Sequence, residues 1–230
     1  RGQFDDALGR YGELELVARK TRNIQGRMWA RSGRAMVWAK LGRVDEALRV
    51  FADVAQLVEQ VNDQSERIIY GLTAALHLAR GRRAEALAVA ERTLAMIVAA
   101  PPAGSQVLPG IEGVATALFQ LWRTTPPSPA RRALEGQARQ AIAALDEYAR
   151  LFPIGRPDAL RLAAALRVAE GYTSGVDDLL EAAVADAVRL GMRVEEGRAR
   201  LALAERKTGA DASAERERGR AILETARARL

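Results

Sequence analysis

Apolar residues recur every three or four positions along almost the whole chain, a pattern that predicts a succession of amphipathic α-helices. Short breaks containing glycine or proline separate the periodic segments. Ala and Leu fill most apolar positions, whereas the β-branched and aromatic runs typical of strands are scarce. The predicted class is therefore all-α, with helices over residues 2–20, 25–40, 45–61, 65–80, 82–99, 108–123, 130–151, 158–170, 174–190, 194–208 and 212–228.

One motif recurs at a nearly constant spacing and sets the phase of these helices. It consists of a glycine, three variable residues, an acidic residue, alanine and leucine, and it begins at Gly2, Gly42 and Gly81. Gly42 lies 40 residues after the first of these glycines and 39 before the last, and the later Gly171 and Gly209 are 38 apart. A period of this length is typical of stacked helical repeats.

Glycines at the ends of the periodic segments are predicted to stop the helices. Glycine adopts the left-handed conformation at a helix C-terminus without a Cβ clash. The acidic residues that follow are then expected in the first turn of the next helix, where the helix dipole favours them. Ser128 is the expected N-cap of a later helix, with Pro129 at its first position.

These signals predict one helical-repeat domain over residues 1–230, a solenoid of about five to six antiparallel helix pairs. Residues 1–24 are expected to form the second helix of a truncated unit. The following pairs cover residues 25–61, 62–103, 104–152, 153–191 and 192–230. Because the first unit lacks its first helix and Arg1 is not an initiator Met, we expect a fragment of a longer protein. The segment 124–129 is interpreted as an insertion without an assigned role.

Composition narrows the chemistry that the chain can perform. Hydrophobic residues make up 49% and aromatic residues 5% of the sequence, and no cysteine is present. Disulfides, thiol nucleophiles and cysteine metal sites are thereby excluded. The longest apolar run, residues 94–103, is far shorter than the roughly 18 residues of a membrane span and contains Pro101 and Pro102. With no signal peptide at its start, the chain is expected to be cytoplasmic, without membrane contact.

No residue pattern predicts catalysis. His77 is the only histidine and lies in an otherwise apolar helix, so we interpret it as a packing residue rather than a general base. Pairs of acidic residues fall near helix starts, where capping and dipole effects explain them. Phosphate-binding glycine motifs do not occur. We therefore expect no catalytic residues, no cofactor and no metal.

The chain contains 35 arginine and lysine residues, almost all of them arginine, and 29 aspartate and glutamate residues. Its net charge is therefore +6. Most of the basic residues lie within a helical turn of Glu or Asp, so solvated ion pairs are the favoured interpretation. Nucleic-acid binding is the less favoured alternative, and it would use Arg80, Arg82, Arg83, Arg131 and Arg132.

The repeat motif resembles the tetratricopeptide repeat. Gly42, Ala47 and Phe51, preceded by Trp38, match the small and aromatic positions of that family's helix pair. The spacing of 38 to 48 residues is longer than the family's usual 34, and Arg34 stands where Leu is commonest. The longer units of this chain resemble the repeat arrays at the C-terminal ends of large bacterial signalling ATPases, nucleotide cyclases and transcription activators. The resemblance implies a right-handed superhelix that binds proteins or peptides and has no chemistry of its own.

In the resembled family, exposed faces of the first helices line a binding groove. When the helix positions of that family are carried over to this chain, they predict a groove lined by Trp29, Met36, Lys40, Ile68, Leu78, Ile111, Val114, Leu118, Trp122 and Arg161. Its middle is apolar, which suits a partner helix. The alternative interpretation is that neighbouring helices bury these residues, because the array is tightly wound or the phase is shifted by one residue.

The sequence thus favours a protein-interaction and regulatory domain of a larger bacterial signalling or transcription-regulatory protein. A partner segment, or another domain of its own chain, would occupy the groove. Trp29, Met36, Leu118 and Trp122 are the predicted anchors, and Lys40 and Arg161 would orient an acidic flank. A sensor of small apolar molecules or peptides is the alternative. The identity of the partner and the oligomeric state stay open.

Overall fold

The computed structural model describes residues 4–61, 64–99 and 104–228, and within these ranges the chain is all-α, without a strand. The predicted fold class is confirmed. Contacts divide the chain into two compact units, Gln3–Gln137 and Ala138–Leu230, where the sequence analysis expected one domain. The boundary falls inside helix α8 (Pro129–Leu151).

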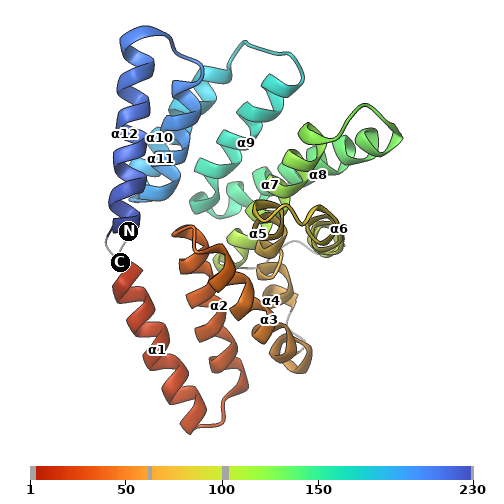
Figure 1. Cartoon of the computed structure of the whole chain (residues 1–230), viewed down its shortest axis with the longest axis vertical. Helices are drawn as coiled ribbons and strands as arrows, with labels where there is room; N and C mark the ends of the chain where they lie inside the picture. The colour runs from red at the N-terminus through yellow and green to blue at the C-terminus, as the bar shows by residue number, and fades with distance from the viewer. Residues whose placement is uncertain (1–3, 62–63, 100–103, 229–230) are drawn as a thin grey trace. The chain divides into compact units, whose positions relative to one another are not determined.

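Neighbouring helices of the first unit pack in sequence order (Figure 1). Helix α1 packs against α2, α2 against α3, and α3 against α5, while α5, α6 and α7 contact one another. The elements of this unit before α8 are α1 (Phe4–Lys20), α2 (Ile24–Lys40), α3 (Val44–Val61), α4 (Gln64–Ile69), α5 (Leu72–Ala79), α6 (Arg83–Ala99), the short 3-10 helix η1 (Ser105–Val107) and α7 (Leu108–Thr124).

The second unit repeats this arrangement. Helix α9 packs against α10 and α11, α10 against α11, and α11 against α12. Sequential packing of helix neighbours is the arrangement of an α-solenoid. Besides the end of α8, the elements are the 3-10 helix η2 (Pro153–Gly155), α9 (Arg156–Ala169), α10 (Val176–Leu190), α11 (Arg193–Ala204) and α12 (Gly209–Ala228).

Four of the five predicted glycine stops are confirmed by the backbone. Gly42, Gly81, Gly171 and Gly191 follow the ends of their helices with φ between 68° and 87°, in the left-handed region. The stop predicted at Gly209 is wrong, because α11 ends at Ala204 and Gly209, with a φ of 63°, is the first residue of α12. The turn between α1 and α2 has no glycine, and there Arg22 adopts a φ of 54°. Ser128 caps α8 as predicted, because its Oγ accepts a hydrogen bond from the backbone N–H of Arg131 at 3.1 Å.

The predicted continuous helix over residues 65–80 is wrong, because the structure breaks it between α4 and α5 at Gly71. The backbone N–H of Gly71 bonds to the carbonyl of Ile68 at 2.8 Å, and that of Thr73 to the carbonyl of Tyr70 at 2.9 Å. These tighter i to i+3 bonds mark a local departure from α-helical geometry. The end of α11 also differs, since this helix stops at Ala204 rather than at residue 208.

The break lies directly on the start of α7. A Cβ at Gly110 would overlap the carbonyl of Ile68, and one at Gly113 would lie 2.7 Å from Cα of Leu72. No side chain fits between these backbones, so glycine at both positions lets α7 approach the broken helix. The break between α4 and α5 therefore lies in close backbone contact with α7.

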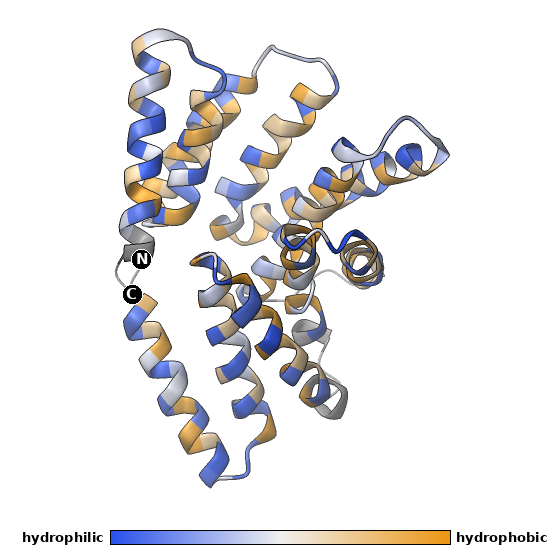
Figure 2. Ribbon diagram, in the orientation of Figure 1, coloured by the Kyte–Doolittle hydropathy of each residue, from blue (hydrophilic) through white to orange (hydrophobic). Residues whose placement is uncertain are grey.

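Hydrophobic and hydrophilic residues are interspersed along the helices, as Figure 2 shows, and this pattern is typical of amphipathic helices. In the first unit Met28, Val54 and Leu57 form one buried cluster, with Val50 packed against it. In the second unit Ala164, Val176, Leu180 and Leu203 form another. Each cluster joins side chains from different helices of its unit.

Replacing Gly110 by Ala should destabilise the first unit by about 1–3 kcal/mol or more, because the new methyl group forces backbone apart. Gly136 of α8 is the matched control, since a Cβ there would meet nothing within 4 Å. At that position the same substitution should stabilise by about 0.5–1 kcal/mol through helix propensity. Urea unfolding followed by circular dichroism measures both. Equal midpoints for the two variants would contradict the close contact.

Candidate protein-interaction surface

Helix α2 is held on one flank by α1. Its N-terminus is capped by Asn23, whose Oδ1 accepts a hydrogen bond from the N–H of Gly26 at 2.8 Å. A Cβ at Gly26 would lie 3.0 Å from Cβ of Ala18, and one at Gly33 would overlap the ring of Tyr11. The glycine-lined flank of α2 therefore lies against α1.

The opposite flank of α2 packs against α3. Met28 is fully buried against Val54 and Leu57 of that helix, and Ala35 is also buried. With both flanks covered, two stripes along α2 remain less buried. Residues 29, 36 and 40 form one stripe, and residues 27, 34 and 38 form the other, since positions seven or eleven apart fall on one side of a helix.

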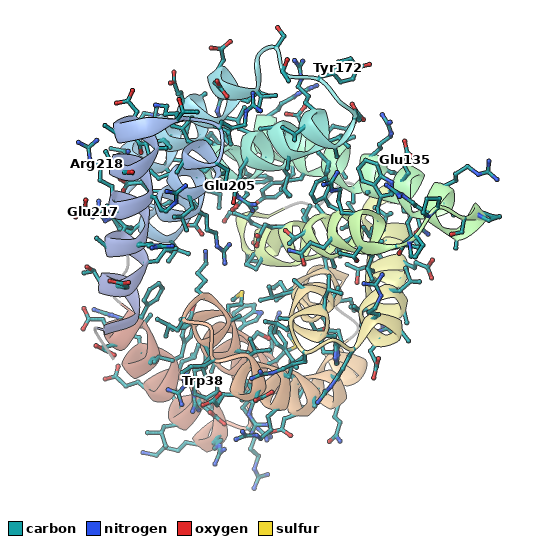
Figure 3. All side chains as sticks on the ribbon, turned by 45° about the horizontal axis from the view of Figure 1, so that its top comes forward. Trp38, Glu135, Tyr172, Glu205, Glu217 and Arg218 are labelled. Atoms are coloured by element: carbon teal, nitrogen blue, oxygen red, sulfur yellow. The ribbon has the colours of Figure 1, made fainter. Side chains whose placement is uncertain are left out.

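The second stripe is occupied by contacts within the chain. The guanidinium of Arg34 lies 5.0 Å, and that of Arg43 5.6 Å, from the ring centroid of Trp38. Figure 3 labels this tryptophan. Arg34 also donates to Glu15 Oε2 at 3.0 Å, and Arg43 donates to Glu46 Oε1 at 2.9 Å. Arg34, a departure from the repeat pattern, thus joins α2 to α1.

Glu15 is the charged centre of that joint. It is 7% exposed and accepts hydrogen bonds from Arg19 at 2.8 Å and from Arg31 at 3.0 Å, besides Arg34. Burial raises the pKa of Glu15, but the hydrogen bonds and positive charges of Arg31 and Arg19 outweigh it and hold the pKa below its usual value. The carboxylate is therefore charged near neutral pH and ties three arginines together.

The first stripe carries an exposed aromatic residue. Trp29 is 49% exposed, whereas Trp122 is 4% exposed and two guanidinium groups lie over the ring of Trp38. Met36 and Lys40 of the same stripe are half-buried. Trp29 is thus the tryptophan that offers most of its ring to a partner.

Two exposed apolar residues of α1 continue this surface. Leu14 is 37% and Val17 57% exposed. Because Tyr11 lies beside Gly33 and Ala18 beside Gly26, residue 14 lies about level with Trp29 along the two helices. Glu15 marks the flank of α1 near Arg34, so Leu14 falls on the opposite flank, the one on the Trp29 side. We call Leu14, Val17, Trp29 and Met36 the Trp29 surface.

Five of the residues predicted to line the groove belong instead to the core of the first unit. They are at most 4% exposed: Ile68, Ile111, Val114, Leu118 and Trp122. Trp122 also contacts Phe119 edge to face, with ring centroids 5.8 Å apart. Neighbouring helices therefore bury these five residues, as the alternative interpretation predicts. Leu118 and Trp122 are not exposed, so the prediction that they anchor a partner is wrong.

The reason is a shift of one residue in the phase of α7. This helix packs against both α5 and α6, and these contacts cover the side that holds the predicted residues. The less buried side carries Glu112, Thr116, Phe119 and Arg123, each one or two positions further along. One residue turns a helix by about 100°, so a small error in phase exchanges a buried face for an open one.

The other predicted groove residues differ in their surroundings. Leu78 is half-buried in α5. Arg161 belongs to the second unit. Its guanidinium donates a hydrogen bond to Asp158 Oδ1 at 3.1 Å, and Asp158 is 3% exposed. This guanidinium is thus engaged by its own helix. Of the ten predicted groove residues, the structure brings Trp29, Met36 and Lys40 together on one stripe of α2.

His77 is half-buried in α5, and burial together with the positive charge of Arg82 lowers its pKa. In the part of the chain that the structure describes, no three His, Asp or Glu side chains are grouped as metal ligands would be. None of the described helices has the length and apolarity needed to cross a membrane.

Comparison with known proteins assigns no family. No protein-family model matches the chain, and a search of curated proteins gave no significant match. The resemblance to tetratricopeptide repeats therefore stays a prediction based on the motif, and the surface geometry carries the functional argument.

Replacing Glu15 by Gln should destabilise the chain at neutral pH by about 1–3 kcal/mol, because three arginines lose a buried charged acceptor. The folded pKa is lowered, so the stabilising charge is present above about pH 4.5 and is lost as the pH falls through the folded value. The difference between variant and wild type should therefore shrink in acid. Urea midpoints from pH 7 to pH 3 measure it, with exposed Glu13→Gln as the control. A difference independent of pH would contradict the assignment.

Proposed function

We propose that this chain is a non-catalytic helical-repeat domain of the tetratricopeptide type, which binds a segment of a partner protein on the Trp29 surface. Following the resemblance of its repeats, we place it in a larger bacterial signalling or transcription-regulatory protein. The partner segment comes from another protein or from another domain of the same chain. The single observation that carries the proposal is the half-exposed ring of Trp29 beside exposed Leu14 and Val17.

Tryptophan is among the residues that dominate binding energy in protein interfaces, where a large ring enters an apolar pocket of the partner. Both flanks of α2 are fixed by α1 and α3, so Trp29 stands on a rigid support. Little conformational freedom of the backbone is then lost on binding, which favours affinity. The polar Arg34 and Trp38 stripe on the other side of α2 offers no comparable apolar contact.

The geometry fits a helical partner segment. Residues 29 to 40 of α2 span about 16 Å at 1.5 Å per residue, about three turns of a helix. An amphipathic segment with apolar residues at i, i+3 or i+4, and i+7 presents a stripe of similar length. Lys40 stands at the end of the stripe, in the position proposed for contact with an acidic residue of the segment.

Selection from a displayed library of random 16-residue peptides tests this function. Selected peptides should carry apolar residues at helical spacing, and Trp29→Ala should weaken their binding at least tenfold, or about 1.4 kcal/mol. Fluorescence anisotropy with the labelled peptides measures the dissociation constants.

Trp38→Ala is the matched control, since it removes the same side chain from the other stripe of α2. Its effect on peptide binding should stay within twofold once circular dichroism shows unchanged helix content. Peptides that bind wild type and Trp29→Ala equally well, or that lose binding only with Trp38→Ala, would refute the Trp29 surface as the binding site.

A further inference from the structure

A second surface of the first unit is formed where α6 begins and α7 ends. Arg83, at the start of α6, donates to Thr124 Oγ1 at 2.7 Å and to Thr125 Oγ1 at 3.0 Å. It also reaches the carbonyl of Leu121 at 3.5 Å. The helices α6 and α7 are in contact, and α8 follows after a short loop (Figure 1). These bonds tie Thr124 and Thr125, at the end of α7, to the start of α6.

Positive charge is concentrated at this point. Residues 80–85 and 121–135 together contain six arginines and two glutamates, and no lysine or aspartate. These two short segments therefore carry +4 of the +6 net charge of the whole chain. Such a local excess creates a positive potential that attracts anionic partners.

Four of the six guanidinium groups are open to a ligand. Arg80 donates to both carboxylate oxygens of Asp45, at 2.7 and 2.5 Å, and Arg83 is held by the two threonines. For the other four, no ion pair or side-chain hydrogen bond is found among the described residues. We call them the arginine cluster: Arg82, Arg123 and Arg132, which are exposed, and Arg131, which is half-buried.

The backbone beneath the cluster is held in place. Arg131 and Arg132 lie in the first turn of α8, which Ser128 caps. Pro126 and Pro127 lie in the exposed loop before α8, and Pro129 is its first residue; their rings restrict φ. Side chains on a restrained backbone lose less entropy when they bind, as preorganised sites do.

From this concentration of unpaired charge we infer that the arginine cluster binds an acidic segment of a protein partner, a second contact separate from the Trp29 surface. Guanidinium groups bind carboxylates through two parallel hydrogen bonds, so four of them can engage several Glu or Asp side chains of one short segment.

An acidic peptide fits this surface better than a nucleic acid. Proteins that bind single-stranded nucleic acids combine a basic groove with aromatic side chains on which the bases stack. Beside the cluster, Trp122 is 4% exposed and packs against Phe119. Of the five arginines expected to contact nucleic acid, Arg80 and Arg83 are already engaged within the chain. The three that remain, Arg82, Arg131 and Arg132, lie on two short segments rather than along a long basic track.

Binding of a fluorescein-labelled decaglutamate peptide, followed by anisotropy at 50 mM NaCl, tests the inference. The double variant Arg82→Gln, Arg132→Gln should weaken binding at least tenfold. The matched control, Arg49→Gln, Arg92→Gln, removes the same charge from exposed positions on α3 and α6, and should change binding less than twofold. All three proteins should show the same circular dichroism spectrum and the same urea midpoint within error.

Equal weakening by the two double variants would overturn the inference, because net charge alone would then explain binding. Tighter binding of a labelled decathymidylate than of decaglutamate at the same salt would also overturn it, in favour of nucleic acid. Wild-type protein that binds neither probe refutes the site. Because Trp29→Ala leaves the cluster unchanged, decaglutamate should bind that variant normally, which separates this result from a failure of the Trp29 surface.

Discussion

Close approach of helix backbones through small residues is the constraint on which the rest of the structure depends. Tyr11 lies across α2 because position 33 has no side chain, and α7 rests on the broken α4–α5 segment because position 110 has none. In the second unit, a Cβ at Gly219 of α12 would lie 3.0 Å from the carbonyl oxygen of Gly197 of α11. Helices in such contact cannot slide or rotate without a clash, so the side chains on their open faces keep fixed positions.

Buried carboxylates held by arginines are a second feature that favours one packing of the helices over others. In the second unit, Glu196 is 4% exposed and accepts from Arg193 at 2.9 Å and Arg200 at 3.0 Å, and Arg200 extends to Glu215 of α12 at 2.8 Å. Asp186 is held in the same way by Arg156 and Arg189, and Glu15 plays this part in the first unit. Such pairs add little net stability but penalise any packing that would leave a carboxylate buried alone. Much of the arginine content is thereby used inside the chain.

The two proposed surfaces consist of side chains that these internal contacts do not use. They differ in the interaction that would drive binding. The Trp29 surface would bind by burying apolar area, a driving force that depends little on salt. The arginine cluster would bind through charge, and screening would weaken it as ionic strength rises. Both lie in the first unit, so one partner with an apolar helix and an acidic segment could use both, the first for affinity and the second for rate of encounter.

The sequence by itself determined the properties that depend on near neighbours in the chain. The amphipathic periods, the helix stops at Gly42, Gly81, Gly171 and Gly191 and the cap at Ser128 all follow from local sterics and hydrogen bonding, and each was predictable. Tertiary structure alone decided which face of each helix is covered. In the sequence, Ile111, Val114 and Leu118 form a stripe that is predicted to be exposed, but the packing of α5 and α6 against α7 buries them. The broken segment between α4 and α5 meets its close backbone contact far along the chain, at Gly110. Burial is a property of the contact between distant segments, and a rotation of one residue, about 100°, separates an exposed face from a buried one.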